Sequence, residues 1–139
     1  MALPTKIALE VVTPEGLLLR ESVDELVAPG AEGYFGVRPG HTPLMAALGL
    51  GELSYRQGET WRRLTCFSGW CEVLPDRVNV LADIAERAED IDVERAEEGL
   101  RRAEERMKRI KDEEGYEEAH SSYVREVTRL AAARHQRGQ

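Results

Sequence analysis

The residue types that most often carry catalysis are few in this 139-residue chain, and their spacing does not suit a reaction. The three histidines are His41, His120 and His135. The sequence contains no H-E-x-x-H metal motif, nucleophile elbow, Walker A loop or dinucleotide fingerprint. Neighbouring carboxylates such as Asp24 and Glu25 diverge on a strand or a helix, so they are expected to be solvated. We therefore predict no catalytic site and no enzyme.

The two cysteines indicate buried thiols rather than a metal site. Cys66 and Cys71 are too few, and wrongly spaced, for a zinc site of the C-x-x-C type. Both lie in segments where apolar residues alternate with polar ones, as expected for thiols buried in a protein of the reducing cytoplasm. No metal ligands are predicted.

Composition excludes several other classes. A formal net charge of −7 and a pI near 5.1 argue against a nucleic-acid binder that neutralises phosphates. The N-terminus carries only Lys6 before a short alternating segment, which is not a signal peptide. No stretch approaches the ~20 apolar residues of a membrane helix, so we expect any membrane association to run through other proteins.

The first part of the chain is predicted to form an antiparallel β-sandwich over residues 1–85. Apolar residues there repeat with period two in short runs separated by turn residues, with no helix between them. Gln57-Gly58-Glu59 and Pro75-Asp76-Arg77 are predicted hairpin turns. The expected strands cover residues 7–11, 17–20, 23–28, 53–56, 60–67, 70–74 and 78–81.

Residues 88–137 are predicted to form an antiparallel two-helix hairpin. Apolar residues at alternate spacings of three and four mark the first helix, which Asp90 or Asp92 would cap and Gly115 would end in a left-handed conformation. The predicted seam consists of Val93, Ala96, Leu100, Ala103, Met107 and Ile110 facing Tyr116, Ala119, Tyr123, Val127 and Leu130. This alanine-rich seam, interrupted by Gly99, buries little apolar area. The hairpin should therefore pack against the sandwich or against a partner protein, and it should be able to change from one to the other.

Residues 30–48 combine glycines and prolines with apolar side chains, which predicts a rigid loop between sheet segments. Two interpretations are open. The apolar residues either fill the sandwich core or form a docking surface on which Glu32, Tyr34, Arg38 and His41 lie outermost.

The pattern Gly33-x-Phe35-Gly36-Val37-x-Pro39-Gly40-His41-x-Pro43-Leu44 resembles the signature of the epsilon subunit of F-type ATP synthases, and the sandwich-then-hairpin layout is similar to that family over the whole chain. The resemblance implies a non-catalytic central-stalk subunit on the cytoplasmic face of the bacterial inner membrane. Its implied partners are the gamma subunit, the rotor c-ring and the catalytic alpha and beta subunits. The implied docking loop includes Glu32, Tyr34, Phe35, Arg38 and His41.

The resemblance also implies two roles for the hairpin. Extended into the catalytic head, it would inhibit ATP hydrolysis. Folded on the sandwich, it would leave rotation free, and ATP would favour that state as a regulatory ligand, with no cofactor required. The segment Ile91-Asp92-Val93-Glu94-Arg95-Ala96 resembles an ATP-binding motif of some family members. Carried over by position, the implied ATP-binding residues are Glu86, Ile91, Asp92, Arg95, Ala96, Arg102, Arg125 and Arg129.

Plainer interpretations of the hairpin charges stay open. The arginines could be solvated or paired along a helix, as Glu98 with Arg102. Residues 112–118 carry five acids and no base, whereas residues 119–139 carry four arginines and one acid. The basic helix end suits an acidic partner surface or simply complements the helix dipole. The alternative function is a free-standing nucleotide-sensing module without a rotary partner, which would have no reason to expose apolar residues on the loop.

Overall fold

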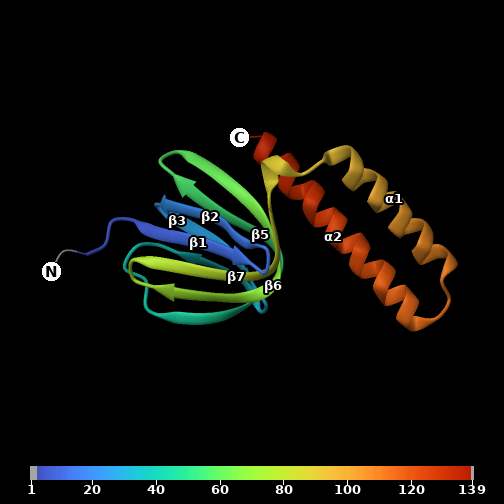
Figure 1. Cartoon of the computed structure of the whole chain (residues 1–139), viewed down its shortest axis with the longest axis horizontal. Coiled ribbons are helices and arrows are strands. Elements are labelled where there is room, and N and C mark those ends of the chain that lie inside the picture. The colour runs from blue at the N-terminus through green and yellow to red at the C-terminus, as the bar shows by residue number, and fades with distance from the viewer. Residues whose placement is uncertain (1–2, 139) are drawn as a thin grey trace.

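The computed structural model describes residues 3–138, which form a curled β-sheet and a helical hairpin to one side of it (Figure 1). The N-terminal end of the chain lies on the side of the sheet away from the helices (Figure 1). The elements in these residues are β1 (Ile7–Thr13), β2 (Gly16–Val23), β3 (Glu25–Gly30), β4 (Gly33–Val37), β5 (Leu44–Gln57), β6 (Thr60–Leu74), β7 (Arg77–Arg87), a short 3₁₀ helix η1 (Ala88–Asp90), α1 (Val93–Arg109) and α2 (Glu113–Arg137).

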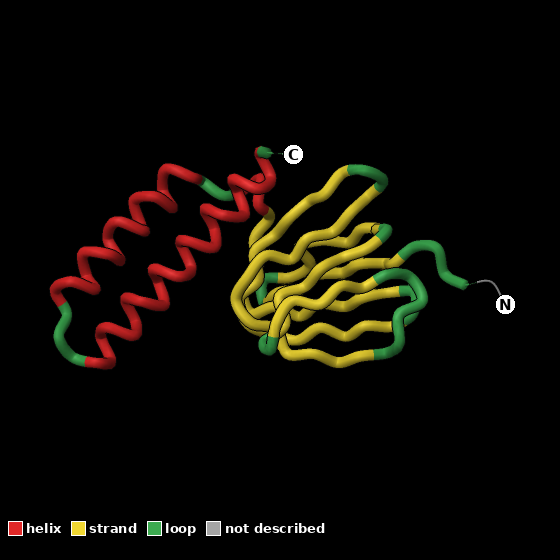
Figure 2. The backbone as a smooth tube through the Cα atoms, turned by 180° about the vertical axis from the view of Figure 1, so that it is seen from behind, coloured by secondary structure: helices red, strands yellow, loops and turns green. Residues whose placement is uncertain are grey.

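The seven strands form one sheet in the order β2-β1-β7-β6-β5-β3-β4, which curls over so that its inner faces enclose a core (Figure 2). The predicted sandwich followed by a helical hairpin is confirmed, but the sheet is mixed rather than purely antiparallel. Crossovers place β1 beside β7 in the same direction, with Ala8 opposite Arg77 and Val12 opposite Leu81. The first strand is thereby joined to the last strand of the sandwich.

The core follows the period-two pattern of the sequence. Ile7, Leu9 and Val11 of β1 are fully buried, while the residues between them face outwards. Cys66 and Cys71 are both buried free thiols, as predicted, although an odd spacing should place them on opposite faces. The backbone of Ser68 between them has a positive φ of 64°, which reverses the alternation within β6.

The predicted segments 60–67 and 70–74 are therefore one continuous strand, β6, that bends at Ser68. Gly69 follows with a φ of 129°. A Cβ atom at Gly69 would lie 2.0 Å from the backbone oxygen of Leu81 on β7, so only glycine fits there.

The prediction of a rigid loop between sheet segments over residues 30–48 is wrong in part. Residues 33–37 form β4 and β5 already begins at Leu44, so only residues 31–32 and 38–43 of this segment lie outside strands. β4 is the edge of the sheet, where among the described residues it pairs with β3 alone, so the weaker pairing of its glycines affects a single neighbour. Pro29 is tolerated in β3 because it lies in an irregularity of the β3–β5 register between Val27 and Gly30.

The helical hairpin turns earlier than predicted. Asp92 caps α1, its carboxylate accepting a bond of 3.2 Å from the Arg95 N–H. Gly115 does not end this helix in a left-handed conformation. α1 ends at Arg109, and the Asp112 carboxylate accepts a bond of 2.9 Å from the Gly115 N–H as the cap of α2. A strong N-cap residue thus places the glycine inside the second helix.

The two helices pack side by side, and α2 carries the contacts to the sheet (Figures 1 and 2). Ala96, Ala103, Ala119 and Leu130 lie buried, as the predicted seam requires. Val127, also predicted in the seam, is 41% exposed, because the neighbouring Glu126 faces α1 instead.

Candidate functional site

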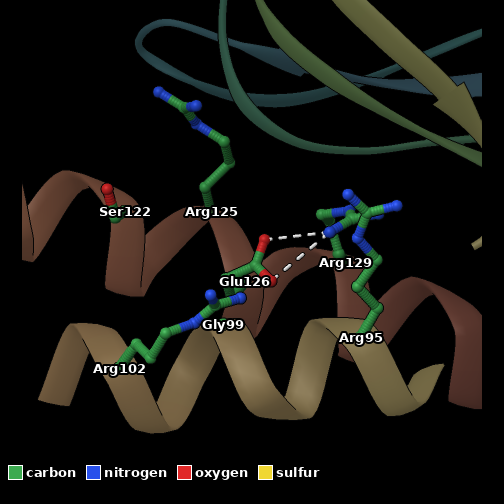
Figure 3. A pocket seen from close by; sticks show the side chains of 7 residues that line it. All are labelled: Arg95, Gly99, Arg102, Ser122, Arg125, Glu126 and Arg129. Atoms are coloured by element: carbon green, nitrogen blue, oxygen red, sulfur yellow. Dashed lines mark hydrogen bonds and ion pairs between the residues drawn. The ribbon is translucent and has the colours of Figure 1, made fainter. Parts of the chain in front are cut away.

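A polar groove of about 260 Å³ runs between the two helices of the hairpin (Figure 3). One wall comes from α1 and the other from α2, and both helices place long basic side chains at the edge of their packed seam. The lining residues are Arg95, Gly99, Arg102, Ser122, Arg125, Glu126 and Arg129.

All four arginines singled out in the sequence line this groove, but they differ in orientation. Arg95 and Arg102 project from α1, and Arg102 extends towards Glu126 (Figure 3). Arg125 points away from α1 towards the sheet (Figure 3). Its guanidinium carbon lies 5.7 Å from the centroid of the Phe67 ring, within the range of a cation–π contact.

Arg129 joins the hairpin to the sheet through two carboxylates. Its Nε and Nη2 donate to the two carboxylate oxygens of Glu86 at 2.8 and 3.1 Å, a bidentate geometry. Its Nη1 donates to Glu126 Oε1 at 3.0 Å. The bonds to Glu86, and secondarily those to Glu126, hold the pKa of Arg129 above its ordinary value. Arg129 is therefore matched by two acids.

Glu126 is the charged residue of the groove that sequence reasoning missed. Its side chain is 16% exposed and sits opposite Gly99, where an added Cβ atom would lie 2.5 Å from Glu126 Oε2. A glycine in the middle of α1 costs roughly 1 kcal/mol of helix propensity relative to alanine. The available signal was Gly99 itself, because a small residue on one helix makes room for a larger side chain on the other.

Three residues of the predicted ATP motif lie outside the groove lining. Ala96 is fully buried and Ile91 is 5% exposed, both in a small core that includes Leu130 and Ala133. Asp92 caps α1 and borders a shallower polar hollow near Arg95. The structure thus brings Glu86 and the four arginines to one region, and it gives Ile91 and Ala96 packing roles.

The predicted docking loop is only partly exposed. Glu32 and Arg38 face solvent, and the Tyr34 side chain is 60% exposed while its hydroxyl accepts a bond from the Glu52 N–H. Phe35 packs against the sandwich core. His41 is half-buried, with Nδ1 2.6 Å from the Thr42 backbone oxygen.

An apolar row crosses the outer face of the sheet. Strand pairing sets Trp70 beside Leu81, Leu81 beside Val12, and Val12 beside Leu17. Trp70, Leu81 and Leu17 are 55%, 57% and 50% exposed. The row continues through Ala47, the partner of Trp70 on β5, to Met45, which is 62% exposed on the same face.

The end of α2 is fastened to β6 by a side-chain clasp, defined here as Gln136 with its two backbone partners. Gln136 Oε1 accepts from the Arg63 N–H at 2.7 Å, and Gln136 Nε2 donates to the Trp61 carbonyl at 3.2 Å. The amide thereby imitates one unit of strand pairing on β6, beyond the last residues with which β7 pairs. His135 adds a polar contact, with Nδ1 3.0 Å from Glu52 Oε1.

Comparison with known proteins agrees with this architecture on both halves of the chain. Residues 6–88 match the family described as "ATP synthase, Delta/Epsilon chain, beta-sandwich domain", and residues 89–134 match "ATP synthase, Delta/Epsilon chain, long alpha-helix domain". A relative from Syntrophobacter fumaroxidans named "ATP synthase epsilon chain" is 48% identical over 92% of this chain and 96% of its own length. Another of that name, from Solibacter usitatus, is 51% identical over 72% of this chain and 75% of its own length.

Solved structures support the fold. A chain in the Euglena gracilis mitochondrial ATP synthase, OSCP/F1/c-ring, superposes with a TM-score of 0.82 at 22% identity, covering 95% of this chain and 84% of that one. A chain in the central stalk/c-ring structure of the Tetrahymena thermophila mitochondrial ATP synthase gives a TM-score of 0.63 at 14% identity, covering 95% and 99%. No helix within residues 3–138 is long and apolar enough to cross a membrane. The family resemblance inferred from the signature is confirmed: this chain belongs to the ATP synthase delta/epsilon chain family.

Proposed function

We propose that this chain is a non-catalytic rotor-stalk subunit of a rotary ATP synthase, peripheral to the cytoplasmic face of a bacterial inner membrane. Its sandwich would join the gamma subunit to the c-ring and so help couple proton flow to ATP synthesis. Its hairpin would restrain ATP hydrolysis by the catalytic alpha and beta subunits. Family membership and relatives named as ATP synthase epsilon chains support this proposal.

The observation that carries the docking role is the exposed apolar surface of the sandwich. Trp70 and Leu81 are each more than half exposed and adjacent, and they belong to a row that crosses five strands. Tyr34 and Met45, both within residues 30–48, are also about 60% exposed. Contiguous apolar surface of this kind marks an interaction site. A free-standing nucleotide sensor has no use for it, which favours the stalk subunit over that alternative.

The regulatory role is supported by the small interface between the hairpin and the sheet. Its small core is mostly alanine, and its polar links to the sheet are those of Arg129, His135 and the Gln136 clasp. Such an interface suits a hairpin that exchanges between a compact and an extended arrangement. We propose ATP as the ligand that favours the compact one, with its phosphates near Arg95 and Arg102. A ligand shifts such an equilibrium only by its differential affinity for the two states.

The first experiment tests docking with the full chain. Trp70→Asp with Leu81→Asp should abolish binding to the purified gamma subunit, whereas Glu59→Lys, in an exposed turn, should not. Loss of binding by the double variant alone supports the stalk role. Full binding by the double variant would remove the apolar row from the interface, and absence of binding by the unmodified chain would favour the free-standing sensor.

The second experiment tests the hairpin. The sandwich core contains only residues up to Ala85, so residues 1–87 retain that core intact. ATP hydrolysis by the cognate catalytic head should fall when the full chain is added and stay unchanged with residues 1–87. Equal rates with both bound forms would reject the inhibitory role of the hairpin while leaving the docking role in place.

A further inference from the structure

The groove between α1 and α2 contains an acidic side chain in a place where the helical seam calls for an apolar one. Glu126 lies between Ala119 and Leu130 on the buried side of α2, and its carboxylate reaches across to Gly99. Its side chain is 16% exposed. Burying a carboxylate to this extent is unfavourable unless it is paired, and here the pairing comes from the guanidinium of Arg129.

We propose that Glu126 is an internal counter-anion that occupies the arginine groove and sets its affinity for a polyphosphate. This inference rests on the proposed regulatory nucleotide site. Among the lining residues there are four guanidiniums and one carboxylate, a formal charge of +3. A bound triphosphate would meet this carboxylate inside the groove, where partial burial weakens solvent screening.

The geometry makes Glu126 a competitor rather than a support for the arginines. Arg129 is already oriented by its two bonds to Glu86, at 2.8 and 3.1 Å, which do not involve Glu126. Arg102 extends from α1 towards Glu126 in the close view (Figure 3). Removing the carboxylate charge therefore leaves the Arg129–Glu86 bridge in place and raises the formal charge of the groove lining to +4.

The direction of the effect follows from Coulomb's law. A unit charge a few ångströms from a bound phosphate in a partly buried groove alters its affinity by at least about tenfold. The repulsion acts on the phosphates and not on the adenine of ATP. Glu126→Gln should therefore raise the affinity for inorganic tripolyphosphate and for ATP by similar factors. Arg102→Gln added to Glu126→Gln should reverse most of the gain, which places the effect in this groove.

The test is isothermal titration calorimetry of the full chain with tripolyphosphate and with ATP. Glu126→Gln and Glu126→Ala are the two test variants, and Glu117→Gln is the control, because it removes one negative charge from an exposed site on the same helix. Thermal melts establish that each variant is folded. We expect both Glu126 variants to bind each ligand at least tenfold more tightly than the unmodified chain, and the control to match it.

The possible outcomes distinguish failure of this inference from failure of the proposed nucleotide site. Equal or weaker binding by both Glu126 variants, with measurable binding by the unmodified chain, would overturn the counter-anion role and leave the nucleotide site standing. No binding of either ligand by any folded variant at millimolar concentration would overturn both. The docking role of the sandwich is measured with the gamma subunit and is affected by neither result.

Discussion

Replacing Gln136 with alanine should release the end of α2 from the sheet. The side-chain amide makes two of the hydrogen bonds between this helix end and β6, accepting from the Arg63 N–H at 2.7 Å and donating to the Trp61 carbonyl at 3.2 Å. The third runs from Arg63 Nη1 to the His135 carbonyl at 3.2 Å. Both bonds of the amide are partly buried, and alanine keeps the helix propensity of the position. The substitution therefore removes the clasp without weakening the helix that carries it.

The expected size follows from these two bonds. Each hydrogen bond between neutral groups contributes roughly 1 kcal/mol net, so the pair stabilises the docked helix end by about 2 kcal/mol. This corresponds to about a 30-fold increase in the population of the opened arrangement. The contact of His135 with Glu52 and the bridge of Arg129 with Glu86 remain, so global unfolding should change far less than this local opening.

Amide hydrogen exchange of the full chain, followed residue by residue by NMR, measures this opening directly. The Arg63 amide should lose about 30-fold of its protection in Gln136→Ala, while core amides such as those of Leu9 and Val80 keep theirs. Arg137→Ala, at the exposed neighbouring position, serves as the control. Unchanged protection of the Arg63 amide would refute the clasp as an energetic link.

The core and the salt bridges give three more expectations. Leu53→Ala, at a fully buried position, should lower the free energy of unfolding by about 2–5 kcal/mol in urea titrations. Burial raises the pKa of Cys66 to about 12 and that of Cys71 to about 11, so neither thiol should react with iodoacetamide at pH 8 until the chain is unfolded. The bond from Arg56 holds the pKa of Glu25 below its ordinary value near 4.5. The stability this adds is present above that value and is lost as the pH falls through the folded pKa, so Glu25→Gln should flatten the acid limb of a stability–pH curve.

The order of strands and helices could be predicted because the spacing of apolar residues within each element is visible in a short stretch of sequence. Alternating apolar residues located β1, and the spacing of alanines located the helices that pack through Ala96 and Ala103. β4 was missed because its glycines argue against a strand unless it lies at an edge, and edge position is a property of the whole sheet. The parallel pairing of β1 with β7 is likewise set by crossovers that no local pattern encodes.

The sequence predicted the arginines of the groove, but it did not predict that Glu126 lies among them. The antiparallel hairpin predicts that Arg102 lies across the seam from Arg129, and both line the groove. Arg125 also lines it, but its guanidinium points away from α1 towards Phe67. Glu126 and Val127 differ by about 100° of rotation around the helix, so which one faces α1 depends on the rotation of α2 about its axis. The gap left by Gly99 on the opposite helix fixes that rotation, and the sequence alone does not show the two positions in contact.

The pairing of β1 with β7 also sets the order in which the molecule is completed on the ribosome. Ala8 and Arg77, which lie opposite each other, are separated by 69 positions in the chain. Until β7 emerges, β1 has only β2 as a neighbour, and the apolar face of Ile7, Leu9 and Val11 is left without most of its cover. Bringing β1 and β7 together closes a long loop of chain, which is entropically costly and slow. The helical hairpin, in contrast, forms through contacts between neighbouring segments of the chain. A ribosome stalled before residue 77 would therefore present an unfinished sheet edge to chaperones, although nearly nine-tenths of the sandwich has already been synthesised.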